Sequence, residues 1–144
     1  MEEYGGDKEL NMFEIAVCDN QGLLFAECQS DFESDAKDFI VKFMHSDIAR
    51  SMDNNISPYH NTGTKQIGEA LLESDNVKIF EGAIKNKDML YWMGYIYRYW
   101  NKWLGESSEC IYSQADYDYM VIVYNYFHTL SPEQAILRIK SKNK

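Results

Sequence analysis

The segment that most constrains this chain is Met89–Leu104, which reads MLYWMGYIYRYWNKWL. It contains all three tryptophans and four of the eleven tyrosines of the protein. At helical spacing its apolar residues cover most of the circumference, and both Trp92 and Trp100 are expected to be largely buried. The remaining positions form a narrow stripe: Tyr91, Gly94, Arg98, Asn101 and Lys102. A helix that is apolar over most of its surface is expected in the middle of a fold, with other helices packed around it.

The rest of the chain favours further helices in one domain. At 144 residues the length matches a single domain that can bury a core. Residues 1–11 are polar and predict a flexible acidic tail, followed by a single helical domain over 12–144; Met12 is a second candidate for the first residue. Residues 32–52 predict one helix with a buried stripe that includes Phe39 and Phe43, and Ser131 with Pro132 predicts another helix start. The expected fold is a compact all-α bundle of roughly five to seven helices around the aromatic segment.

Residues 13–28 are consistent with two structures. Two apolar runs flank Asp19-Asn20-Gln21-Gly22, which is typical of a short hairpin. The helical alternative places Phe13, Ala16, Val17, Asn20, Leu24 and Cys28 on one apolar face. Helix is favoured, because nothing else in the chain offers a third strand and an isolated hairpin is marginally stable in water.

The negative charge is confined to the first quarter of the chain. The net charge is −9, and residues 1–38 hold eleven acids against Lys8 and Lys37, which already gives −9. Binding to nucleic acid or to an anionic membrane requires a basic surface, so both partners are disfavoured and a basic protein is the natural complement. No apolar run approaches the roughly 20 residues of a membrane span, and no signal peptide pattern opens the chain. With three cysteines and no CxxC pair, a reducing, cytoplasmic location is expected.

No pattern in the sequence predicts catalysis, a metal site or a cofactor. Cys18, Cys28 and Cys110 are interpreted as core residues, and His128 as a buried structural histidine. Arg98 has two interpretations: a solvated residue of the polar stripe, or a guanidinium stacked on rings and paired with a carboxylate of a neighbouring helix. The residues predicted to bind a partner are Glu33, Asp35, Asp38 and Arg98.

Three stretches carry a resemblance to a known group of proteins. They are FIVKFMHSDIA at 39–49, YWMGY at 91–95 running on to Tyr99-Trp100, and GESS at 105–108 followed by FHT at 127–129. Together they resemble small uncharacterised antitoxin-like bacterial proteins encoded beside toxins of the ADP-ribosyltransferase type. The resemblance implies a helical fold and a neutralising, partner-binding role, and it implies no catalytic residue.

Two functions from different classes therefore follow. The first is a non-enzymatic, antitoxin-like protein that binds a toxin with a basic cleft. The alternative is a small enzyme or ligand-binding domain whose pocket is walled by aromatic residues of 91–103 and 117–127, with His128 as the acid–base group.

Overall fold

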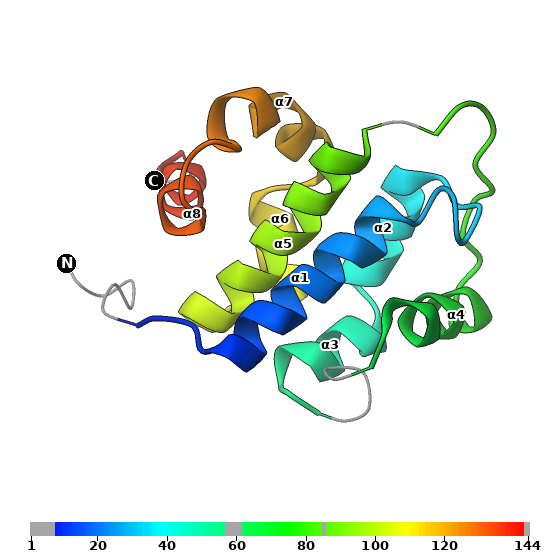
Figure 1. The fold of residues 1–144 in the computed structure, drawn as a ribbon, viewed down its shortest axis with the longest axis horizontal. Helices are drawn as coiled ribbons and strands as arrows, with labels where there is room; N and C mark the ends of the chain where they lie inside the picture. The colour runs from blue at the N-terminus through cyan, green and yellow to red at the C-terminus, as the bar shows by residue number, and fades with distance from the viewer. Residues whose placement is uncertain (1–7, 57–61, 85, 143–144) are drawn as a thin grey trace.

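The computed structural model describes residues 8–56, 62–84 and 86–142, and helices account for most of this part (Figure 1). The predicted all-α class is confirmed, but the eight helices of the described residues exceed the predicted five to seven. They are α1 (Met12–Ala26), α2 (Ala36–Met44), α3 (Asp47–Asp53), α4 (Thr64–Ser74), α5 (Lys87–Leu104), α6 (Ser108–Gln114), α7 (Tyr117–Phe127) and α8 (Pro132–Ser141). Of the predicted tail, residues 1–7 lie outside the described part.

The predicted helix over 32–52 is two helices, α2 and α3, and this break adds to the helix count. Ser46 separates them as the N-cap of α3, with its hydroxyl accepting a hydrogen bond of 3.1 Å from the Ala49 N–H. An N-cap residue has extended rather than helical backbone angles, so the preceding helix has to end there. The predicted buried stripe survives the break, because Phe39 and Phe43 are both fully buried.

Helix α1 confirms the helical interpretation of residues 13–28 as far as Ala26, but of the predicted apolar face only Leu24 and Cys28 are fully buried. A capping box between Asn11 and Glu14 starts the helix. Phe13 is 76% exposed and Ala16 is exposed as well. The buried residues of α1 are Cys18, Gln21, Gly22, Leu24, Phe25 and Ala26.

The buried face of α1 is selected by close packing against α5, and the two helices run side by side in Figure 1. A Cβ atom on Gly94 would lie 2.5 Å from the backbone oxygen of Gln21. A Cβ atom on Gly22 would lie 2.6 Å from the ring of Tyr91. Both separations are too short for real atoms, so the two glycines allow an approach that any larger residue would prevent.

Helix α5 contacts α1, α3, α6, α7 and α8, and twelve of its residues are buried. Trp100 is fully buried, as predicted, whereas Trp92 is only partly buried and meets the ring of Tyr124 edge-on at 5.5 Å. The helix ends at Gly105, whose φ of 79° is left-handed and whose N–H donates to the Asn101 carbonyl. None of the helices in the described ranges is both long and apolar enough to cross a membrane.

Between α4 and α5 the chain runs without a helix from residue 75 to 84 and passes beside the turn that precedes α2. An isolated antiparallel bridge joins Ser34 to Ile79. Figure 1 shows this green connection as a long excursion away from the helices. This connection brings residues 78–80 beside residues 33–35, next to the acidic residues predicted to bind a partner.

Candidate functional site

Glu33, the first predicted partner-binding residue, lies in the turn between α1 and α2 and is exposed. Its φ of 50° is in the left-handed region, which side chains of this size rarely adopt. Two backbone hydrogen bonds hold the turn: the Phe80 N–H donates to the Glu33 carbonyl at 2.9 Å, and the Ser34 N–H donates to the Cys28 carbonyl at 3.0 Å. The structure therefore fixes Glu33 at the surface in an unusual backbone conformation.

Asp35 and Asp38 lie close to Glu33 but are engaged within the fold. Asp35 is the N-cap of α2 and accepts from the Asp38 N–H at 3.1 Å. Asp38 accepts from the Lys78 N–H at 2.7 Å and from the Lys42 ammonium at 2.9 Å. Burial raises the pKa of Asp38, but these two donors outweigh it, so the pKa of this carboxyl is lowered overall. Both side chains thus have local structural roles.

Three connected hollows surround Glu33 and the 76–84 segment. The first, of about 670 Å³, lies between the turn before α2 and helix α4. The second, of about 390 Å³, shares Ser30 and Glu33 with the first. The third, of about 600 Å³, shares Ile79 and Phe80 with the second. These shared residues show that the hollows adjoin one another on the surface.

Apolar side chains are exposed on this surface. Ile79 is 71% exposed, Ile84 is 48% exposed and Leu72 is 37% exposed. Single exposed apolar residues are normal on protein surfaces, but a group inside one concave region is typical of an interaction site. These residues were not predicted as a site, although the β-prone run Val77-Lys78-Ile79-Phe80 is typical of a short extended segment.

The charged residues that line the hollows are mostly acidic. They are five acids and two lysines: Asp31, Glu33, Asp35, Glu69 and Glu81, with Lys65 and Lys78. Other nearby lysines are neutralised by partners elsewhere, since Lys37 pairs with Asp118 and Lys87 with Glu27. We call the surface formed by Asp31, Glu33, Glu69, Leu72, Ile79, Glu81 and Ile84 the acidic face.

Arg98 is not part of this surface. Its side chain is fully buried, so the interpretation as a solvated residue is wrong, and it does not lie where a partner could contact it. The predicted pairing with a carboxylate is confirmed: Arg98 donates to Asp53 of α3 at 2.6 Å. Its other polar contacts are to side-chain oxygens of Gln21, Asn101 and Ser108, rather than to a ring face.

A second buried cation, Lys102, lies one helical turn beyond Arg98. Its ammonium donates to the Met52 carbonyl at 2.7 Å and to the Asn55 side chain at 2.6 Å. Burial and the neighbouring charge of Arg98 lower the pKa of Lys102 to about 8. The two cations therefore fasten the C-terminal end of α3 to α5.

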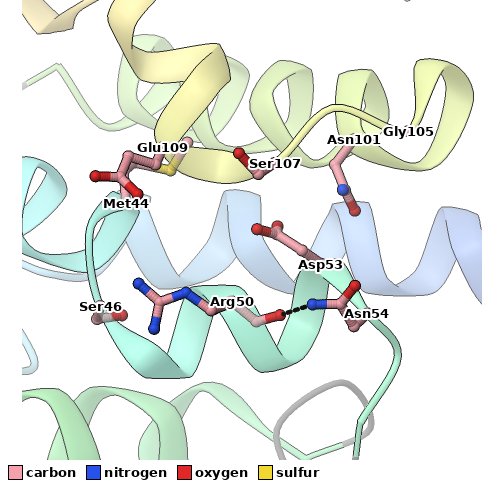
Figure 2. A pocket seen from close by; sticks show the side chains of 9 residues that line it. All are labelled: Met44, Ser46, Arg50, Asp53, Asn54, Asn101, Gly105, Ser107 and Glu109. Atoms are coloured by element: carbon pink, nitrogen blue, oxygen red, sulfur yellow. Dashed lines mark hydrogen bonds between the residues drawn. The ribbon is translucent and has the colours of Figure 1, made fainter.

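A polar pocket of about 200 Å³ lies over this network and is lined by Asp53, Asn101, Ser107 and Glu109, among others (Figure 2). It is smaller than the roughly 300–1,000 Å³ of typical ligand sites. Both oxygens of Asp53 already accept hydrogen bonds, one from the Ser108 N–H and the other from Arg98 and the Ser108 hydroxyl. The guanidinium of Arg50 points away from Asp53 in Figure 2 and pairs with Asp47. Asp53 therefore serves the fold.

Two further predictions about reactive residues are wrong. His128 is exposed, with its ring stacked 4.5 Å from that of Tyr124 and its Nδ1 2.7 Å from the Tyr124 carbonyl. Cys110 is exposed, whereas Cys18 and Cys28 are buried as predicted. Within the described ranges, no group of three or more histidine, cysteine or acidic side chains could hold a metal ion.

The geometry defines an all-helical domain that presents a concave, acidic surface with exposed aliphatic side chains. The sequence matches no family model, and neither a curated protein nor a solved structure is significantly similar to it. The function is therefore argued from the residues of this chain.

Proposed function

We propose that this chain is a non-enzymatic protein-binding module of the antitoxin-like kind, which neutralises a toxin by direct contact through the acidic face. The observation that carries the proposal is the group of exposed apolar residues, Leu72, Ile79 and Ile84, among exposed carboxylates. The fold does not need this combination, because neither the exposed apolar side chains nor the exposed carboxylates add to the packing of the core.

The two kinds of side chain have separate roles in binding. Carboxylates attract a basic partner over a distance and raise the rate of association, with an effect that falls as salt is added. The isoleucines lose water when the partner docks. Their burial stabilises the complex by about 25 cal/mol for each Å² of apolar surface buried, and this slows dissociation. The matching partner is a protein whose contact surface is basic with an apolar centre.

The charge contribution is tested with a triple variant, Asp31→Asn, Glu33→Gln and Glu69→Gln. A matched control, Glu9→Gln, Asp88→Asn and Glu109→Gln, removes the same charge from exposed positions that do not line the three hollows. The probe is the purified product of the neighbouring gene, and stopped-flow association is measured at several salt concentrations. We expect the triple variant to associate about tenfold more slowly with a flatter salt dependence. Equal rates and salt slopes for the triple variant and the control would refute the proposal.

Two matched isoleucine variants test the apolar contribution to binding. Ile79 and Ile122 are similarly exposed, at 71% and 66%, but Ile122 lies on α7. Ile79→Ser should raise the dissociation rate of the complex about tenfold, equivalent to about 1.4 kcal/mol. Ile122→Ser should leave it unchanged. If both variants dissociate like the unmodified protein, the apolar residues of the acidic face do not contribute to binding.

A further inference from the structure

The segment at 76–81 is held like one strand of a two-stranded ladder. The Asp35 N–H donates to the Lys78 carbonyl at 2.8 Å, and the Phe80 N–H donates to the Glu33 carbonyl at 2.9 Å. These two bonds flank the antiparallel bridge between Ser34 and Ile79. Lys78 and Phe80 therefore turn their backbone groups toward the turn before α2.

Alternation along an extended chain then directs the backbone of Ile79 the other way. In a strand, successive residues point their N–H and C=O groups to opposite edges. Since Lys78 and Phe80 face the turn at 33–35, the N–H and C=O of Ile79 face outward. A strand edge of this kind is a template for pairing with another chain.

The segment is open to solvent. A hollow of about 600 Å³ is lined by Asp35 and by every residue from Asn76 to Glu81. Lys78, Ile79 and Glu81 are exposed, and no hydrogen bond among the described residues engages the N–H or C=O of Ile79.

We propose that the acidic face binds its partner by strand addition: an extended segment of the partner pairs with the outward edge of residues 77–81. This segment carries an aliphatic residue opposite Ile79 and a basic residue opposite Glu81. This inference rests on the proposed function and deepens it by naming the form of the partner. Strand addition obtains affinity from main-chain hydrogen bonds and specificity from alternate side chains.

Charge and apolar exposure select the side chains of the added segment. Glu81 is an exposed acid on the same face of the strand as Ile79, and it matches lysine or arginine. Ile79 and Ile84 line the adjoining hollow, and they match aliphatic residues. An extended segment made only of acids or only of apolar residues would not satisfy both features.

The probe for this inference is the capped peptide acetyl-Lys-Thr-Val-Thr-Lys-Thr-Val-amide, titrated into the full chain; as a strand it carries lysine and valine in turn on one face and threonine on the other. Two further peptides carry N-methyl groups, one on every threonine and the other on every lysine and valine. Only one alternate set of amides faces the edge of a neighbouring strand, so one methylated peptide should bind like the parent and the other at least tenfold more weakly. Equal binding of the two methylated peptides overturns the proposal. So does the absence of saturable binding at about 1 mM, where a free energy of about −4 kcal/mol still registers.

The protein side is tested at Ile79. Ile79→Pro removes the outward N–H, whereas Ile79→Ala retains it and serves as the control for the lost side chain. We expect the proline variant to bind the parent peptide at least tenfold more weakly than the alanine variant. In the unsubstituted protein, hydrogen exchange of the Ile79 amide should slow at least tenfold when the peptide binds. Unchanged exchange overturns strand addition even if the proline variant fails to fold.

The two proposals fail separately. If the peptide tests fail but the acidic triple variant still slows association with the neighbouring gene product, only strand addition is overturned. If the peptide binds as described but the triple variant associates normally, strand addition stands and the acidic steering of the proposed function is overturned.

Discussion

The guanidinium of Arg98 donates to Oδ1 of Asp53 at 2.6 Å, with the arginine side chain fully buried and the aspartate side chain 6% exposed. The second oxygen of Asp53 accepts from the Ser108 N–H at 2.8 Å. One carboxylate thus joins the end of α3 to the middle of α5 and to the start of α6. A buried ion pair of this kind is strongly destabilising to break, because removing one partner leaves an uncompensated charge.

Arg98→Lys is therefore expected to reduce the free energy of unfolding by about 2 kcal/mol. An ammonium can keep a contact with Asp53, but it cannot also reach Gln21 and Ser108 in the plane of a guanidinium. Urea denaturation measures the loss. The control is Arg50→Lys, at the exposed pair with Asp47, which should change stability by less than about 0.5 kcal/mol. Equal effects at the two arginines would show that the Arg98 network adds little.

Gly94→Ala tests the close packing of α1 on α5. In an exposed helix this change stabilises by about 1 kcal/mol, because alanine has the higher helix propensity. Here the new Cβ would lie 2.5 Å from the Gln21 backbone oxygen, so α1 has to move. We expect a loss of about 1–3 kcal/mol, measured by thermal and urea denaturation. The reverse substitution at an exposed position, Ala16→Gly, should cost about 1 kcal/mol. A Gly94→Ala protein more stable than the unsubstituted chain would contradict the packing described here.

The fold class was predicted from local sequence signals. The wrong predictions concern features that depend on packing between residues far apart in the sequence. The helix start at Ser131 and Pro132 depends on neighbours in sequence and was predicted. The buried face of α1 was predicted only in part, because it depends on the close approach of Gly22 to Tyr91 and of Gly94 to Gln21 across two helices. Apolar periodicity placed Phe13 on the apolar face of α1. The close approach of the α1 and α5 backbones selects a different face, and Phe13 is exposed.

The candidate site was predicted only in part, for a related reason. The acidic concentration near Glu33 is visible in the sequence. The engagement of Asp38 is not, because its partner Lys78 lies 40 residues away. Likewise, a carboxylate partner for Arg98 could be expected, but its identity as Asp53, 45 residues distant, depends on the fold. The outward edge of Ile79 arises from the bridge to Ser34, which no local pattern indicates.

Stability should fall as the pH rises above 9, because of the two buried thiols. Burial raises the pKa of Cys18 and of Cys28 from an ordinary 9.0 to about 12. Above pH 9 the unfolded chain releases these protons and the folded chain retains them, which favours unfolding. Between pH 9 and 10 each thiol should cost about 1 kcal/mol of stability. The double variant Cys18→Ala, Cys28→Ala should show a shallower slope over this range, whatever its absolute stability, and an unchanged slope would refute the assignment.

Substitutions at Asp38 and Glu33 separate the acids that support the fold from those that are free to bind. Asp38→Asn weakens the acceptor for the Lys42 ammonium and for the Lys78 N–H, and we expect a loss of about 1 kcal/mol. The lowered pKa of Asp38 sets the sign with pH: its contribution is present above its ordinary value of 3.8 and is lost as the pH falls through the folded value. Glu33→Gln changes an exposed side chain and should leave the melting temperature unchanged or slightly raised, since it reduces repulsion on the acidic face.

Melting curves at pH 7 and pH 3 test both variants. The contrast should be clear at pH 7 and should shrink at pH 3, where protonation weakens the ion pair in the unsubstituted protein as well. A Glu33→Gln variant that melts as low as Asp38→Asn would mean that Glu33 also serves the fold and is not free for a partner.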